Sequence, residues 1–480
     1  MMLLENRLYE MEQIIADNAP MAIEQIVEEE IRSFKTSEKY KIMVEAEQYY
    51  RNRSDVQRKH NDIRNRSNVR MEHPILKKLV DQKANYLLSK PFTVDSKNRP
   101  YNGALNEMFD NELRRKMKSL GKGAVKSGIA YLAPFFDGGK LKFMRLPSME
   151  VIPLWSDAER TKMSAYIRFY EQTVFDGARK KTVLRAEYWD VNGVKRFKNN
   201  GNGGRQLVAD YDSGVCEEAH FQIDGKPYNF DTVPIAWVKY NEEELPLQYF
   251  IKDLINDYNW QSSVTADVLR DVAKFIYIIK NYGGTDLSEF VKDLNQHLAI
   301  KVDGDGGVDK LQADINVDAV MRFLEKNRRD IFDFASAVDT KDPNLGSASG
   351  TAINFRYMDL DIDCAALAAE LQDTFVQMKV FFDVYFQVAG KGDFSKEKFE
   401  VLFNADLPVN ETDIITNIRN SEGIVSKRTR LANHPWVRDV DEEMEQLKQE
   451  QQEAVEQFGS GMFDDAMGAM QSGGAVNDER

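Results

Sequence analysis

The sequence predicts an α+β protein that is mainly helical. Apolar residues recur at helical spacing before residue 50 and again between residues 246 and 458. Between these regions, the block 129–240 consists of short aromatic and β-branched segments separated by glycine turns, which is typical of antiparallel strands. Apolar residues make up 42% of the 480 residues, so a large core can form and the composition argues against global disorder.

Charge and cysteine content narrow the class of protein. Cys216 and Cys364 lie far apart, which favours a reducing compartment over a disulfide framework. No signal peptide opens the sequence, and no apolar run approaches the roughly 20 residues that span a bilayer. The net charge is −14, of which residues 441–480 carry −9, from 11 acidic and two basic residues. This balance argues against wrapping DNA, and we expect a protein made in the cytoplasm.

Three helical patterns are expected ahead of the β block. Residues 3–49 form the first, interrupted at Pro20, and residues 75–88 and 103–127 form the next two. The run 51–70 holds seven Arg or Lys against two Asp, which fits either a nucleic-acid patch or a solvated loop. We favour the solvated loop because no aromatic residues alternate with the charges.

The second half of the chain combines long helices with a compact insert. One helix is expected over 246–273 and another over about 317–337, with strands and a short helix in the insert 274–316. A third helix covers about 351–389, and shorter helices follow within 405–458. The N-caps expected in this last region are Asn410 and Ser426.

Motifs for catalysis and metal binding fail in detail. The string GKGAVKSG at 121–128 lacks the second glycine of a phosphate-binding loop. The acidic run 303–314 lacks the turn glycine and the bidentate glutamate of a calcium loop, so a tight turn is favoured. Asp359, Asp361 and Asp363 would point in different directions on a helix. We therefore expect a structural or binding protein, with no enzymatic activity, no cofactor and no metal.

Three stretches, taken together, resemble the portal proteins of tailed double-stranded-DNA bacteriophages of the long-tailed siphophage type. They are HPILKKLVDQKANYLLSKPFTV, NLGSASGTAINFRYMDLD and EGIVSKRTRLANHPWVRDVDEEMEQLKQE. They lie in the family's order and span about 70 to 450. Each stretch is modest alone, but their joint occurrence is specific.

The resemblance implies a phage portal fold in a homo-oligomeric ring, dodecameric in the virion, at one capsid vertex. The implied parts are N-terminal helices and a β-rich wing (1–240), a stem helix (241–273), an α/β clip (274–316), a second stem helix (317–338), a tunnel loop (339–351), a long channel helix with a return strand to the wing (352–404), a helical crown (405–460) and a flexible acidic tail (461–480). The implied partners are double-stranded DNA, bound non-specifically in the channel, the large terminase subunit, the major capsid and scaffolding proteins, and head–tail connector proteins, with no membrane.

The tunnel loop is the segment that the resemblance places against DNA. Its residues predicted to face DNA are Asp339, Lys341, Asp342, Asn344, Ser347, Ser349 and Thr351. Small polar side chains suit identical loops that converge on an axis, and Gly346 and Gly350 permit backbone changes that other residues resist. Without the resemblance, the segment is an ordinary connector between helices.

The clip is the segment that the resemblance assigns to the packaging motor and to the head-completion proteins. Its predicted contact residues are Asn281, Tyr282, Asp286, Glu289, Lys292, Asp303 and Asp305. The implied function is genome packaging, DNA retention and later ejection. Two alternatives stay open: another virion structural protein, such as a head–tail connector, and a metal-dependent nuclease that uses the acidic triplet Asp359, Asp361 and Asp363.

Overall fold

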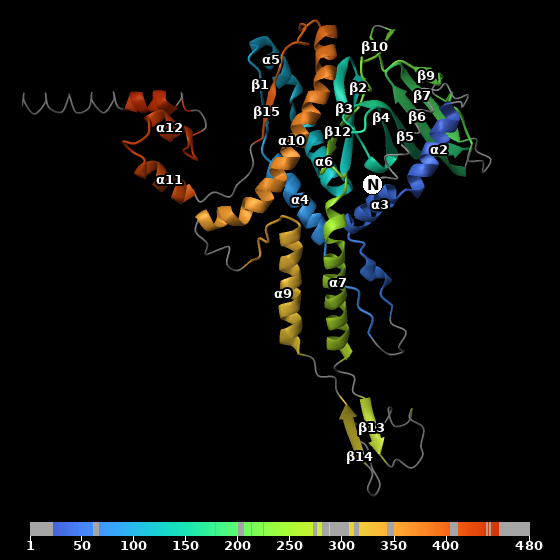
Figure 1. Cartoon of the computed structure of the whole chain (residues 1–480), viewed down its shortest axis with the longest axis vertical. Coiled ribbons are helices and arrows are strands. Elements are labelled where there is room, and N and C mark those ends of the chain that lie inside the picture. The colour runs from blue at the N-terminus through green and yellow to red at the C-terminus, as the bar shows by residue number, and fades with distance from the viewer. Residues whose placement is uncertain are drawn as a thin grey trace, which may run out of the picture. The chain divides into compact units, whose positions relative to one another are not determined.

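The computed structural model of the chain divides into two compact units (Figure 1). One comprises Met1–Lys341 and Tyr357–Asp406, and the other comprises Asp342–Arg356 and Leu407–Arg480. The residues that the structure describes are 23–60, 67–177, 179–199, 206–212, 214–223, 225–271, 276–280, 288, 307–311, 316–342, 350–403, 411–437, 440 and 443–450. Among these residues, no helix is long and apolar enough to cross a membrane.

Among the described residues ahead of the β region, the helix expected over 75–88 is confirmed, whereas the other two expected helices are divided. The helices of this part are α2 (Ile23–Thr36), α3 (Glu38–Tyr50), the short 3-10 helix η1 (Asp55–Arg58), α4 (Ile75–Leu88), α5 (Arg99–Met108) and α6 (Asn111–Ser127). Ser37 separates α2 from α3, because its hydroxyl accepts the Tyr40 N–H at 3.2 Å and starts a new helix. Asp110 likewise caps α6 by accepting the Leu113 N–H at 2.8 Å, so the single helix expected over 103–127 is wrong.

The predicted antiparallel β region is confirmed. The strands are β1 (Thr93–Asp95), β2 (Ile129–Asp137), β3 (Lys140–Leu146), β4 (Val151–Trp155), β5 (Met163–Asp176), β6 (Arg179–Asp190), β7 (Gly193–Asn199), β8 (Leu207–Ala209), β9 (Glu217–Glu218), β10 (Phe221–Ile223), β11 (Lys226–Tyr228) and β12 (Ala236–Lys239), with the 3-10 helix η2 (Ser148–Glu150) before β4. The larger sheet has the order β4-β5-β6-β7-β8 with β9 paired to β7, and a second sheet has the order β12-β2-β3. Every strand pair runs antiparallel, and β10 and β11 form a separate hairpin.

Two helices leave the β region and return to it. α7 (Leu247–Asp271) and α9 (Val317–Phe334) lie side by side and antiparallel (Figure 1). Asn327 of α9 donates to Asp257 of α7 at 2.8 Å, while the start of α7 and the end of α9 enter one core. Between them, β13 (Ile276–Lys280) pairs antiparallel with β14 (Gly307–Leu311). Residues 307–311 of the suspected calcium loop are therefore a strand.

The main core lies where α10 (Gly350–Val388) meets α4, α5, α6, β2 and β3. Phe375, Phe382 and Phe386 of α10 are fully buried there, and Phe109 stacks on Phe375 with ring centroids 5.3 Å apart. β15 (Glu400–Leu402) follows α10 and pairs with β1, so the chain returns to its N-terminal part. The expected helix over 351–389 and the strand after it are both present.

The second unit holds short helices in its described part. They are α11 (Glu411–Asn420) and α12 (Lys427–Ala432), and residues 443–450 are also helical. Ser426 caps α12 by accepting the Thr429 N–H at 3.2 Å, as the sequence predicts. The other expected cap, Asn410, lies outside the described residues. The helical character of this region is thus confirmed where it can be described.

Candidate functional site

The predicted tunnel loop is described at its two ends. Asp339, Lys341 and Asp342 lie in the described stretch after α9, and Thr351 lies in the first turn of α10. The remaining predicted loop residues, Asn344, Ser347 and Ser349, lie outside the described residues. The predicted clip residues Asn281, Tyr282, Asp286, Glu289, Lys292, Asp303 and Asp305 also lie outside them. The candidate site is therefore the base of the loop.

The end of α9 turns sharply before the loop begins. Ser336 has a positive φ of 46°, and the Ala337 N–H donates to the Phe332 carbonyl at 2.9 Å. This left-handed residue with a backbone bond across the last turn is the usual way to close a helix, although glycine is the residue that favours it. A serine here gives no sequence signal, so the sequence places the end of this helix three residues late.

Two side chains hold the backbone as it leaves the turn. Gln82 of α4 pairs with both polar groups of Val338: its amide donates to the Val338 carbonyl at 2.9 Å and accepts the Val338 N–H at 3.2 Å. Val338 itself is buried, so these bonds satisfy backbone groups that water does not reach. The backbone is therefore fixed one residue before the predicted loop.

Asp339 is held by cations on both sides. Arg328 of α9 donates two bonds to its carboxylate, at 2.5 and 2.9 Å, and Lys78 Nζ of α4 lies 3.5 Å away. Burial alone would raise the pKa of Asp339, but the hydrogen bonds from Arg328 and the Lys341 N–H, together with the charges of Arg328 and Lys78, outweigh it and lower the pKa below the ordinary value. The carboxylate also accepts the Lys341 N–H at 3.1 Å. Asp339 is thus an anchor of the loop base, and Lys341 is exposed directly after it.

In the second unit, one ion pair joins residues on the two sides of the loop. Asp342 forms an ion pair with Arg356 of α10, and both side chains are about one-third exposed. These two residues flank the undescribed part of the loop. A partly exposed ion pair of this kind contributes little to the free energy of folding, so it holds Asp342 near Arg356 only weakly.

Lys83 of α4 connects the two helices on either side of the loop. Its side chain is fully buried, and its Nζ donates to the Ser336 carbonyl at 3.0 Å and to Asp363 of α10 at 2.7 Å. The Tyr240 hydroxyl donates to the same carboxylate at 3.1 Å. Burial and the neighbouring Asp363 raise the pKa of Tyr240 far above its usual range, so the phenol stays a neutral donor. One aspartate therefore receives two donors, the buried Lys83 ammonium and the partly buried Tyr240 hydroxyl.

The arrangement of acidic residues on α10 does not favour a catalytic metal centre. Asp361 accepts the Tyr86 hydroxyl at 3.0 Å, and Asp363 is occupied by Lys83 and Tyr240. No group of three or more potential metal ligands occurs among the described residues. Two members of the acidic triplet therefore serve as acceptors for α4, which favours a structural role over the nuclease alternative.

The basic run 51–70 is more ordered than a solvated loop. We call residues 54–60 and 67–73 the strap, because they run along α7. Lys59 is buried and forms an ion pair with Asp267 of α7, so the prediction of a solvated loop is wrong at this residue. Residues 61–66 of the run lie outside the described residues.

A ladder of four bonds fixes the second half of the strap. The backbone N–H groups of alternate residues donate to side chains one helical turn apart on α7: Ser67 to Asp271 (3.1 Å), Val69 to Asp267 (2.6 Å), Met71 to Ser263 (2.8 Å) and His73 to Asn259 (3.1 Å). Two extended residues advance about 6.6 Å and four helical residues about 6 Å, so the two repeats stay in register. The polar residues at every fourth position of α7 were the available sequence signal, and the apolar analysis missed it.

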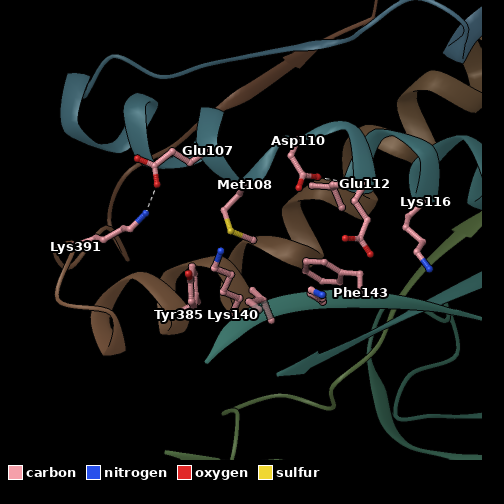
Figure 2. Close-up of a pocket in the computed structure, with 12 residues that line it drawn as sticks. Glu107, Met108, Asp110, Glu112, Lys116, Lys140, Phe143, Tyr385 and Lys391 are labelled. Atoms are coloured by element: carbon pink, nitrogen blue, oxygen red, sulfur yellow. Dashed lines mark hydrogen bonds and ion pairs between the residues drawn. The ribbon is translucent and has the colours of Figure 1, made fainter. Parts of the chain in front are cut away.

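A surface pocket of about 200 Å³ lies elsewhere on the first unit (Figure 2). Its floor is apolar and its rim is charged; the lining residues are Glu107, Met108, Asp110, Glu112, Leu113, Lys116, Lys140, Leu141, Lys142, Phe143, Tyr385 and Lys391. Lys391 forms an ion pair with Glu107 across one edge. None of the predicted site residues lines it.

Comparison with known proteins defines the class. The chain matches the family model "Phage portal protein, SPP1 Gp6-like" over residues 35–457 and therefore belongs to this family. The family is structural, and its members are virion components that assemble as oligomers at a capsid vertex and serve genome packaging and the head–tail connection.

Two relatives cover nearly the whole chain. The chain is 30% identical over 427 residues to the portal protein of Bacillus phage SPP1, with 85% of this chain and 84% of the relative covered. It is 27% identical over 428 residues to the portal protein of a Clostridium phage, phiCD119, with 83% and 90% covered. The portal resemblance drawn from three short stretches is confirmed.

Proposed function

We propose that copies of this chain form a dodecameric ring around an axial DNA channel, with the loop 339–351 projecting into that channel. The observation that supports the loop assignment is the change in environment along the chain. The Val338 backbone is held by Gln82 of α4 and the Asp339 carboxylate is held by Arg328 of α9, whereas the side chain of Lys341 is exposed. A segment with a fixed base, followed by an exposed lysine side chain, suits a part that meets a moving duplex.

The chemistry of the loop fits DNA that must pass without being gripped. Lys341 supplies one exposed cation in each copy, and the hydroxyl groups within 347–351 bond phosphates without reading bases. Each phosphate neutralised by a cation strengthens a salt-dependent hold. Because Asp342 is paired with Arg356, that arginine is partly neutralised and adds less to such a hold.

The other parts of the chain take the remaining roles in this proposal. The β region within 1–240 forms the wing, and α7 and α9 form the stem. The insert 274–316 forms a clip that meets the large terminase subunit during packaging and the head–tail connector proteins afterwards. Residues 405–460 form the crown, residues 461–480 form an acidic tail, and the outer surface of the ring meets the major capsid and scaffolding proteins.

Electron microscopy of the purified full chain tests the ring, and phage carrying loop variants test the channel. We expect class averages that show a closed ring of subunits around a central opening. Lys341→Glu should reduce the fraction of DNA-filled heads, because it replaces one cation in each copy by an anion facing the duplex. Lys326→Glu, on the surface of α9, is the matched control and should leave filling unchanged. A particle without an opening, or equal filling by both variants, would contradict the proposal.

A further inference from the structure

We propose that Lys83 is a positioning residue that ties both ends of the loop between α9 and α10 to α4, so that the two ends move together. This inference rests on the proposed function of the loop only for its biological consequence. The geometric part concerns residues of the first unit and stands on their contacts alone.

One face of α4 contacts the chain on both sides of the loop. Lys78, Gln82 and Tyr86 are spaced four residues apart, so they lie along one ridge of the helix. Lys78 and Gln82 contact the α9 side, at Asp339 and Val338. Tyr86 contacts the α10 side, where its hydroxyl donates to Asp361 and its ring stacks on Tyr357. The ridge is thus divided between the two ends of the loop.

Lys83 joins these two sets of contacts. Its buried ammonium group has three N–H donors. It donates to the Ser336 carbonyl, just after the end of α9, and to the Asp363 carboxylate on α10. A buried ammonium without both acceptors would be costly, so displacement of either end weakens the site as a whole. The Cys364 thiol contacts the Lys83 carbonyl at 3.8 Å, which keeps α10 against the backbone of α4 as well.

These contacts bring two of the three portal-like stretches, which lie far apart in the sequence, together in the structure. Gln82 and Lys83 lie in HPILKKLVDQKANYLLSKPFTV, while Asp361 ends NLGSASGTAINFRYMDLD and Asp363 follows it by two residues. The first stretch provides donors and the second provides acceptors around one loop. Force applied to the loop from either side therefore reaches α4, and through it the core of the first unit.

Hydrogen exchange of the purified full chain tests the coupling directly. Lys83→Met should accelerate amide exchange about tenfold or more in both peptides 335–342 and 357–366. Lys59→Met is the matched control, because Lys59 is also buried and also forms an ion pair with an aspartate of a long helix, Asp267 of α7. That variant should accelerate exchange in the strap and leave both loop ends unchanged. Acceleration at one loop end only, or at neither, overturns the proposal.

A second variant separates positioning from general stability. In Lys83→Met with Asp363→Leu, both charges are gone, so the urea midpoint should return toward that of the wild type. Exchange in 335–342 should nevertheless stay fast, because the Ser336 carbonyl still lacks its donor. Recovery of slow exchange in this double variant overturns the positioning role. If Lys83→Met does not fold, Asp363→Asn takes its place, and it must loosen both ends for the proposal to stand.

Counting DNA-filled heads distinguishes this inference from the proposed function. If Lys83→Met loosens both loop ends and lowers filling relative to Lys59→Met, both proposals are supported. If it loosens both ends while heads fill normally, the coupling stands and the channel role of the loop is overturned. If the ends do not loosen, the coupling is overturned whatever the heads contain.

Discussion

Two buried lysines, Lys83 and Lys59, each pair with an aspartate of a long helix, yet they do different things. Lys83 lies on a regular helix and joins the turn that ends α9 to Asp363 of α10. Lys59 lies in an irregular segment and fastens that segment to α7. The chemistry of the two pairs is the same, so the comparison shows that the position of the lysine decides what the pair holds in place.

The two sites also differ in what remains when the lysine is lost. Around Lys83, the Ser336 carbonyl would lose its donor, and Asp363 would lose its cation and keep the Tyr240 hydroxyl. Around Lys59, Asp267 keeps the Val69 N–H, and three further rungs still hold the strap. We therefore expect the loop base to respond as a unit and the strap to respond locally.

The largest expected effect is on Lys83. Lys83→Met should lower the free energy of unfolding by about 3–5 kcal/mol, because Asp363 loses its buried cation and keeps the Tyr240 hydroxyl, while the Ser336 carbonyl loses its donor. Urea denaturation of the full chain at pH 7 measures this. Lys77→Met, on the exposed side of the same helix, is the control and should change stability by less than about 1 kcal/mol. Equal effects would mean that burial of Lys83 carries no special weight.

The next effect is on Lys59. Lys59→Met should cost about 1–3 kcal/mol, because Asp267 loses its ion pair while the Val69 N–H and three further backbone bonds still hold the strap on α7. Trypsin cleavage after the exposed Arg70 should also become faster, since the strap is held less tightly. A loss as large as that of Lys83→Met would remove the distinction between a local and a shared anchor.

The sequence was sufficient for elements that depend on local apolar spacing. The helices found as α7, α9 and α10 were placed within a few residues, and glycine turns lie between β2 and β3 and between β6 and β7, as a block of strands separated by such turns predicts. The sequence therefore predicts those helices and strands whose apolar residues repeat at regular spacing within one stretch of the chain.

The contacts that fix the loop base could not be predicted, because they join residues far apart in the chain. Gln82 and Val338 are 256 residues apart, and nothing near either residue indicates the other. Lys83 interrupts the apolar face of its helix, which was a signal for a buried charge but gave no partner. The same holds for Asp339, which the portal resemblance places at the DNA-facing loop, because nothing in the sequence indicates that Arg328 pairs with it.

A smaller and pH-dependent effect is expected at Asp339. The folded-state pKa is lowered, so its contribution to stability is present above the unfolded pKa of about 3.9 and is lost as pH falls through the folded pKa. Asp339→Asn should therefore cost about 1–2 kcal/mol at pH 7, and this difference should shrink as pH falls below about 4. Urea midpoints of both proteins across this range measure it. A difference that is constant with pH would show that the charge of Asp339 does not anchor the loop.

The smallest effect separates two adjacent serines of α7. Ser262 and Ser263 both donate to a carbonyl one turn back, at 2.7 and 2.6 Å, but Ser263 also accepts the Met71 N–H of the strap. Ser263→Ala should cost about 1 kcal/mol because that N–H loses its acceptor, whereas Ser262→Ala should be near neutral because alanine favours the helix. Exchange of the Met71 amide gives the local readout and should accelerate in Ser263→Ala alone. If the two substitutions behave alike, the ladder contributes shape but no measurable stability, and Lys59 alone fastens the strap.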